Sequence, residues 1–283
     1  MQIESVIPAG GPGQMRYEKR DHIAYFIFDG SNHLNACTAE MYAEFYRHLL
    51  DFRDDKDLWV GILTGAGERA FSVGGDLKQM RRISEAFTED LASEHFWYPR
   101  STEPEQTSQV AEDIFNLDLY KPIIGAVNGL CLGGGFVYLL ALTDLRIAAN
   151  NSEFGFSEVK RGLGGGGGLS GIARQIPLAH AMWLCLTGET IGVEEARAWG
   201  IVNEVVEPDQ CLARATEIAQ MLCENSPALM RLEKELLLRS LDQSRQESLR
   251  FSWLMHFVQR YSHDAKEGLA AFNEGRDPSY RGW

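Results

Sequence analysis

The chain has 283 residues, of which 45% are hydrophobic and 24% are charged, and this is the balance of an ordinary globular protein. Its formal net charge of -13 argues against nucleic acid and against an anionic membrane surface as partners. Five cysteines without a CxxC pair, and histidines without HExxH or HxxxH spacing, predict neither a disulfide framework nor a metal site.

The N-terminal residues 1–14 predict a short flexible tail, because Pro8–Gly13 is too rich in glycine and proline for regular structure. The tail lacks a basic stretch followed by an apolar core, so it does not resemble a secretory signal. No apolar stretch in the chain approaches the roughly 20 residues that a membrane-spanning helix needs. We therefore expect a cytoplasmic protein with reduced cysteines.

Apolar strands alternate with helical stretches as far as residue 207. Apolar residues recur every three or four positions in Thr38–Phe52, which predicts a helix with Thr38 as its N-cap. Strands separated by helical stretches predict βα repetition and a largely parallel sheet. The polar segment Arg81–Thr107 carries aromatic residues, and is either a lid over a pocket or a surface insertion. The predicted strands are His22–Phe28, Leu58–Leu63, Pro122–Val127, Leu145–Ala149 and Ile201–Val206.

The character of the sequence changes at Glu207-Pro208, after which helical periodicity dominates. We place the boundary of a helical C-terminal region, residues 208–283, at this proline. Within it, Leu249–Val258 is too apolar for a lone surface helix and must cover the core or a partner subunit. The predicted helices are Cys211–Cys223, Ala228–Ser240, Gln246–Tyr261 and Asp264–Phe272.

Three glycine-rich clusters lie at Ala70–Leu77, at Asn128–Gly135 and at Phe154–Glu158, the last followed by further glycines up to residue 168. Glycine lets a ligand approach the main chain closely. The second cluster opens a predicted helix, whose free N–H groups suit a developing negative charge on oxygen. An N–H group from the first cluster completes a site with two donors for a thioester enolate. Each cluster alone is also typical of a tight turn.

Competing motifs are weak. The run Gly162–Gly167 fits GxGxxG but lacks a βαβ setting, so it does not predict a dinucleotide site. No GxxxxGK[ST] phosphate loop occurs, and Gly168–Gly171 falls short of the GxSxG motif of serine hydrolases.

Taken in order, several segments resemble the crotonase, or enoyl-CoA hydratase/isomerase, superfamily from about Met15 to Pro278. The resemblance implies an α/β fold, with a crotonase-like ββα spiral core over residues 15–207 and a helical C-terminal region that forms trimers or dimers of trimers. It also implies an acyl-CoA substrate, with coenzyme A as part of the substrate and no separate cofactor. The segments are Leu34-Asn35-Ala36, Phe71–Leu77, Asn128–Gly135, Asp144–Ala148, Phe154–Glu158, Leu186-Thr187-Gly188, and Asp264–Gly268 with Ala271-Phe272.

By match to the family motif, the oxyanion donors fall on the backbone of Gly75 and Gly134, and the catalytic acid/base falls on Glu158. Family hydratases carry a second glutamate two residues after the glycine triplet, where this chain has Val137. The basic residues Lys78, Lys266 and Arg276 are candidates for contact with phosphate. The residues implied to bind substrate or CoA are Ala36, Phe71, Val73, Gly74, Asp76, Leu77, Lys78, Gly133 and Val137.

A single carboxylate suits the movement of a proton between two carbons of an enolate, whereas adding water usually requires a second group. We therefore expect double-bond isomerisation ahead of hydration or of a hydratase-lyase reaction, the latter including one on an aromatic acyl-CoA. The remaining alternatives are a CoA-independent C–C hydrolase of a diketone and a catalytically silent member of the superfamily. The acidic balance argues against RNA binding.

Overall fold

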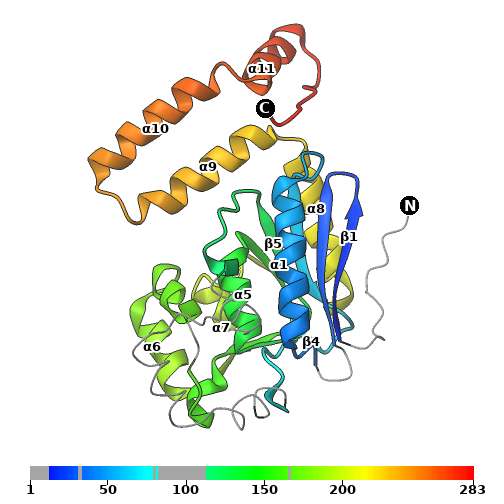
Figure 1. Cartoon of the computed structure of the whole chain (residues 1–283), viewed down its shortest axis with the longest axis vertical. Coiled ribbons are helices and arrows are strands. Elements are labelled where there is room, and N and C mark those ends of the chain that lie inside the picture. Colours follow the sequence, from blue (N-terminus) through cyan, green and yellow to red (C-terminus); the bar gives the residue numbers. More distant parts are fainter. Residues whose placement is uncertain (1–12, 31–33, 79–80, 82–112, 165–166) are drawn as a thin grey trace.

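Two β-sheets of unequal size form the frame of the molecule (Figure 1). The computed structural model describes residues 13–30, 34–78, 81, 113–164 and 167–283, so all of Arg81–Thr107 except Arg81 lies outside the described residues. The larger sheet has the strand order β1-β2-β3-β5-β7-β10, with β1 Gln14–Arg20, β2 Ile23–Asp29, β3 Val60–Gly65, β5 Ile123–Val127, β7 Leu145–Ala149 and β10 Glu204–Val206. The smaller has the order β4-β6-β8-β9, with β4 Ala70–Ser72, β6 Leu130–Leu132, β8 Glu153–Gly155 and β9 Thr190–Gly192.

The large sheet is parallel except for the pair β1–β2. All five strands predicted from the sequence lie in it, within a few residues of their predicted bounds. The prediction missed β1, because only Met15 of its seven residues is buried and the others are mainly charged. A polar edge strand of this kind gives no apolar alternation to detect.

Helix α1 (Ala39–Asp54) covers one face of the large sheet together with the helix 134–142, whose Leu139 lies against Gly125 of β5, and helix α8 (Cys211–Cys223) covers the other face. Helix α1 packs Phe45, Leu49 and Phe52 into a core that also holds Phe26 and Phe28 of β2. Helix α8 packs on the other face, against Ile23, Tyr25 and Ile27 of the same strand. Because β2 is buried on both faces, it is apolar throughout rather than alternating. Thr38 caps α1 as predicted, and its side chain accepts a hydrogen bond from Met41 N.

Helix α5 (Gly134–Leu142) follows the second glycine cluster and is almost wholly buried. Its last carbonyl groups lack helical partners and are bound by the buried guanidinium of Arg146. Arg146 donates to the carbonyl oxygens of Thr143 (2.9 Å) and Leu140 (3.3 Å) and to Oε1 of Gln175 (2.7 Å). The acceptors of the Arg146 guanidinium are all neutral oxygen atoms. Burial lowers the pKa of Arg146 to about 10.

Short elements connect β8 to the helical C-terminal region. They are the 3-10 helices η2 Ser157–Arg161 and η3 Gly167–Arg174, helices α6 Leu178–Thr187 and α7 Val193–Ala198, and the 3-10 helix η4 Pro208–Gln210. We had not predicted α6 or α7 from the sequence, nor the strands of the small sheet, which have only three residues each. Strands this short carry too few positions to show a period.

Beyond α8, helices α9 (Pro227–Ser240), α10 (Arg245–Gln259) and α11 (His263–Glu274) extend away from the sheets (Figure 1). The predicted C-terminal helices are confirmed to within a few residues. Asp264 joins α11 to the chain end, since its carboxylate accepts from Ser226 Oγ (2.7 Å) and from Arg281 N (2.8 Å). Helix α10 has no buried residue, and Trp253 is 69% exposed. None of the described helices is long and apolar enough to cross a membrane.

We expect Arg146→Met to lower the free energy of unfolding by about 3 kcal/mol, because it leaves buried carbonyl groups without donors. Urea unfolding followed by circular dichroism measures this. The matched control is Arg214→Met at a surface pair with Glu204, where the loss should be much smaller because solvent screens the pair. Equal losses in the two variants would contradict the role given to Arg146.

Candidate active site

The three glycine-rich clusters meet at one edge of the small sheet. Strands β4, β6 and β8 are neighbours and run parallel, so their carboxyl ends lie together. Each of the three clusters continues directly beyond one of these strand ends. Ligand sites of α/β sheets form at this edge, where loops leave the strands.

Asn35 fixes the loop that supports the first cluster. Its amide nitrogen donates to the carbonyl oxygens of Ala66 (3.0 Å) and Ala70 (2.7 Å), and its side-chain oxygen accepts from Gly30 N (3.0 Å). The residue is buried with φ +56°, a left-handed conformation in which asparagine is more common than most other residues. Asn35 therefore connects the loop after β2 to the start of β4.

Cys37 holds the stretch that contains Gly75. Its backbone N donates to Gly74 O (2.8 Å), and its carbonyl oxygen accepts from Asp76 N (2.9 Å), which makes a short parallel bridge opposite Gly75. In such a bridge the N–H group of the residue between the two bonded ones, here Gly75, points away from the Cys37 strand. Within the described residues, the Gly75 N–H has no hydrogen-bond partner.

Gly134 brings the second N–H to the same place. It is the first residue of α5, where backbone N–H groups have no partner in the helix. A Cβ atom on Gly74 would lie 2.6 Å from Gly134 N, and one on Gly134 would lie 3.7 Å from Gly75 N. Only glycines permit this approach, and Gly74 also has φ +85°. Two free N–H groups, one at the positive end of a helix dipole, therefore lie side by side.

Glu158 lies against the same glycines. It follows β8 on η2, and its Oε1 is 2.7 Å from where a Cβ on Gly133 would stand. Gly133, with φ +54°, donates its N–H to Gly155 O (2.9 Å) and so ties the end of β6 to the end of β8. Oε2 of Glu158 is buried without a hydrogen-bond partner among the described residues.

Burial raises the pKa of Glu158, and this effect outweighs a hydrogen bond from its own backbone and the charge of Arg161, which lower it. The neighbouring Cys185 thiol, on α6, also has a raised pKa, because of burial and because of the Glu158 charge. A carboxylate with a raised pKa and one oxygen without a hydrogen-bond partner among the described residues is suited to take a proton from a bound molecule.

The other predicted site residues divide into four groups. Ala36, Val73, Gly74, Asp76 and Gly133 surround the two N–H groups, with Asp76 Oδ1 accepting from Lys78 N (2.7 Å). Leu77 and Lys78 are exposed beside them. Phe71 and Val137 lie in the core, Phe71 stacked edge-on against Phe28. Arg276 lies in the C-terminal region and pairs with Glu267 and Glu274 (2.6 Å each).

Tyr42 is a residue that the sequence reasoning missed. It belongs to α1, is buried, and its hydroxyl oxygen would lie 3.2 Å from a Cβ on Gly134. It falls on the inward face of α1 between Met41 and Phe45, so periodicity marks it only as a core position.

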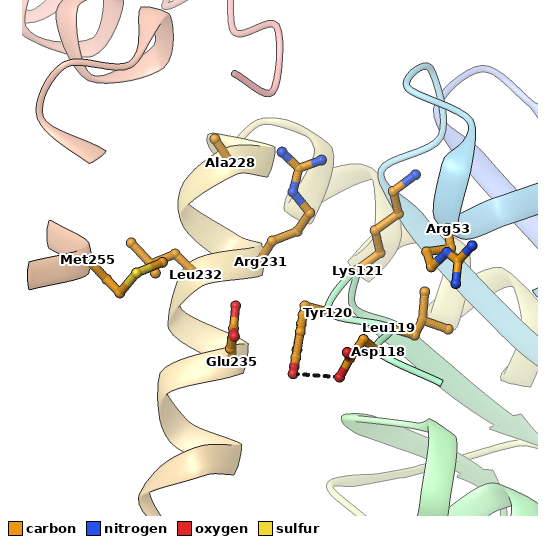
Figure 2. Close-up of a pocket in the computed structure, with 10 residues that line it drawn as sticks. All are labelled: Arg53, Asp118, Leu119, Tyr120, Lys121, Ala228, Arg231, Leu232, Glu235 and Met255. Carbon is orange, nitrogen blue, oxygen red and sulfur yellow. Dashed lines mark hydrogen bonds between the residues drawn. The ribbon is translucent and has the colours of Figure 1, made fainter. Parts of the chain in front are cut away.

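A separate hollow of about 310 Å³ lies between the segment 118–121 and helices α9 and α10 (Figure 2). None of the predicted site residues lines it. Lys121 on its wall donates instead to the carbonyl oxygens of Phe52 (2.5 Å) and Asp55 (2.6 Å) at the end of α1. Tyr120 donates to Asp118, as the dashed line in Figure 2 shows. This hollow is a gap between the core and the C-terminal helices, remote from Glu158.

Paired glycine N–H groups beside one half-buried carboxylate are the arrangement that enolate chemistry uses, in which an acid/base group lies next to an oxyanion site. The chain belongs to the enoyl-CoA hydratase/isomerase family, whose model matches residues 18–282. The resemblance drawn from the sequence is thereby confirmed, and so is the crotonase fold.

Two curated relatives are similar over most of their lengths. An (E)-benzylidenesuccinyl-CoA hydratase of Thauera aromatica is 35% identical over 94% of this chain and 98% of its own. A carnitinyl-CoA dehydratase of Escherichia coli K12 is 37% identical over 88% of this chain and 91% of its own.

The solved structures agree. An enoyl-CoA hydratase subunit of Geobacillus kaustophilus has a TM-score of 0.82 at 30% identity, covering 95% of this chain and 98% of its own. An enoyl-CoA hydratase of Mycobacterium tuberculosis has a TM-score of 0.81 at 32% identity, and the match covers 96% of this chain and 100% of its own.

We expect Glu158→Gln to raise the free energy of unfolding at pH 7. A folded-state pKa above the ordinary 4.5 means that the ionised carboxylate opposes folding, so Glu158 favours the fold below pH 4.5 and loses that contribution as the pH rises through the folded-state pKa. Urea midpoints of wild type and variant at pH 7 and pH 4 measure the difference, which should be larger at pH 7. A variant less stable than wild type at pH 7 would contradict this account.

Proposed function

We propose that the chain is an acyl-CoA hydratase/dehydratase that interconverts a 3-hydroxyacyl-CoA and a 2-enoyl-CoA, with Glu158 as its acid/base group. The observation that carries the proposal is the contact of the Glu158 carboxylate with Gly133, next to the free N–H groups of Gly134 and Gly75. The names of the relatives, one a hydratase and one a dehydratase, favour this reaction.

In the direction of dehydration, the Glu158 carboxylate removes a proton from the α-carbon of the 3-hydroxyacyl thioester. The electron pair moves onto the thioester oxygen, where the N–H groups of Gly75 and Gly134 stabilise the negative charge. As the carbonyl re-forms, a double bond forms between the α- and β-carbons and the β-carbon–oxygen bond breaks. The protonated Glu158 then gives its proton to the departing hydroxide, and water leaves.

One carboxyl group suffices when the α-proton and the departing hydroxyl group lie on the same face of the substrate, because the group that takes the proton is then placed to deliver it. Burial supports this role, since a raised pKa makes Glu158 a better base and keeps its protonated form accessible. Hydration runs through the same steps in reverse.

Double-bond isomerisation, which we expected from the sequence, is the second candidate. The observation that favours it is Val137, which is buried in the core where family hydratases carry a second acid. In this reaction Glu158 would move a proton between the α- and γ-carbons, and no water would be added.

We also place the coenzyme A portion of the substrate near Lys78, an exposed cation that follows the first glycine cluster. Arg276 is a weaker candidate than the sequence indicated, because two glutamates already neutralise it. No cofactor besides the CoA of the substrate enters the proposed mechanism.

Incubation with crotonyl-CoA, carnitinyl-CoA and (E)-benzylidenesuccinyl-CoA in ¹⁸O-labelled water tests the proposal. We expect the label in the product hydroxyl of an enoyl substrate, or loss of water from a hydroxyacyl substrate, and a fall of about 100-fold or more in kcat for Glu158→Gln. The control is Glu153→Gln on β8, an exposed carboxylate that should leave the rate unchanged.

A shifted double bond without ¹⁸O would replace the hydratase proposal with the isomerase. Wild-type turnover in the folded Glu158→Gln variant would remove Glu158 from either mechanism.

We further propose that the chain assembles as a trimer or a dimer of trimers. Large apolar side chains are exposed along α10, and Phe257 is 59% exposed, which is unusual for a monomer. Sedimentation velocity at micromolar concentration should give a trimer or a hexamer, and Trp253→Glu should shift it towards monomer. A wild type that sediments only as a monomer would contradict the proposed assembly.

A further inference from the structure

Tyr42 lies directly behind the second oxyanion donor. Its side chain is only 9% exposed, and its hydroxyl oxygen would lie 3.2 Å from a Cβ on Gly134. Its ring packs on Tyr138 of α5, with centroids 5.2 Å apart at 37°. The position of Tyr42 on α1 therefore determines how closely the start of α5 approaches α1.

The same hydroxyl also reaches the support of the first donor. It lies beside the thiol of Cys37 in the same buried cluster, and the Cys37 backbone brackets Gly75 through Gly74 O and Asp76 N. The Cys37 thiol further contacts Ser72 Oγ at 3.7 Å. One phenol thus touches the residue that carries one donor and the residue that positions the other.

We propose that Tyr42 is a positioning residue that fixes the spacing of the Gly75 and Gly134 N–H groups around the substrate oxygen. The inference rests on the proposed function, because it assumes that these groups bind a thioester oxygen. The hydroxyl is the atom of Tyr42 that comes nearest to Gly134, whereas packing on the Tyr138 ring is shared with Phe45. Displacement of an oxyanion donor by a fraction of an ångström weakens polarisation of the carbonyl group more than it weakens binding.

Tyr42→Phe tests the inference, with carbonyl-¹³C butyryl-CoA as the probe. Infrared difference spectroscopy measures how far the thioester C=O band shifts on binding, and deuterium exchange at the α-carbon in D₂O measures proton removal by Glu158. For Tyr42→Phe we expect a smaller band shift, exchange about tenfold slower, and a Kd for butyryl-CoA within about twofold of wild type.

Tyr25→Phe is the matched control. Tyr25 is another buried tyrosine, but it lies in the core on the other face of the large sheet, where its hydroxyl is 3.4 Å from Thr216 Oγ1 of α8. It should lose a similar amount of stability and keep the wild-type band shift and exchange. If Tyr42→Phe does not fold, Cys37→Ala removes the thiol that lies beside the Tyr42 hydroxyl, and should reduce the band shift in the same direction.

The outcomes separate the inference from the function on which it rests. A wild-type band shift and exchange rate in folded Tyr42→Phe, or in Cys37→Ala where that variant replaces it, would overturn the positioning role and leave the oxyanion site intact. A wild type whose C=O band does not move on binding would overturn the oxyanion site and this inference with it. Glu158→Gln should lose exchange but keep the band shift, which shows that the two readouts are independent.

Discussion

The close contact between the backbones of Gly74 and Gly134 is the constraint on which the site depends. A Cβ atom on Gly74 would meet Gly134 N at 2.6 Å, so the turn after β4 and the start of α5 touch without a side chain between them. This contact requires β4 and β6 to be neighbours and parallel, which the small sheet provides. It also requires α5 to stay in place, and the buried Arg146 binds the far end of that helix. The small sheet and Arg146, which are distant in sequence from Gly74, thus both stabilise the contact between Gly74 and Gly134.

The sequence predicted the large sheet, α1 and the C-terminal helices because each carries a long, regular apolar pattern. Ile23–Asp29 is buried throughout, and Cys211–Cys223 keeps helical spacing over its whole length. It did not predict the small sheet, since β4, β6, β8 and β9 have three residues each. The glycine clusters were visible in the sequence. Their convergence at one site was not, because it depends on the strand order of the small sheet, which no local pattern encodes. Tyr42 was missed for the same reason, because its contacts with Gly134 and Tyr138 are tertiary.

The placement of Glu158 beside an oxyanion site raises the problem of two negative charges in one pocket. The difficulty disappears when charge is followed through the proposed reaction, because the carboxylate becomes neutral as it takes the proton that creates the enolate. Negative charge moves from Glu158 to the substrate oxygen, and the total in the pocket stays constant. A raised pKa of Glu158 favours this transfer, while the Gly75 and Gly134 N–H groups favour its product. In the proposed reaction, the Glu158 carboxylate is therefore where the negative charge starts, and the two N–H groups stabilise it where it ends, on the substrate oxygen.

The glycine triplet can now be explained residue by residue. A side chain at position 133 would collide with the Glu158 carboxylate, at 2.7 Å from Oε1. One at position 134 would stand between the Tyr42 hydroxyl and Gly75 N, and one at position 135 would lie 2.5 Å from Ser72 O. Each glycine thus admits a different neighbour: the Glu158 carboxylate, the Tyr42 hydroxyl with the Gly75 N–H group, and the end of β4. In the proposed reaction the triplet serves the reacting thioester, so the choice of acyl group must come from other segments of the chain.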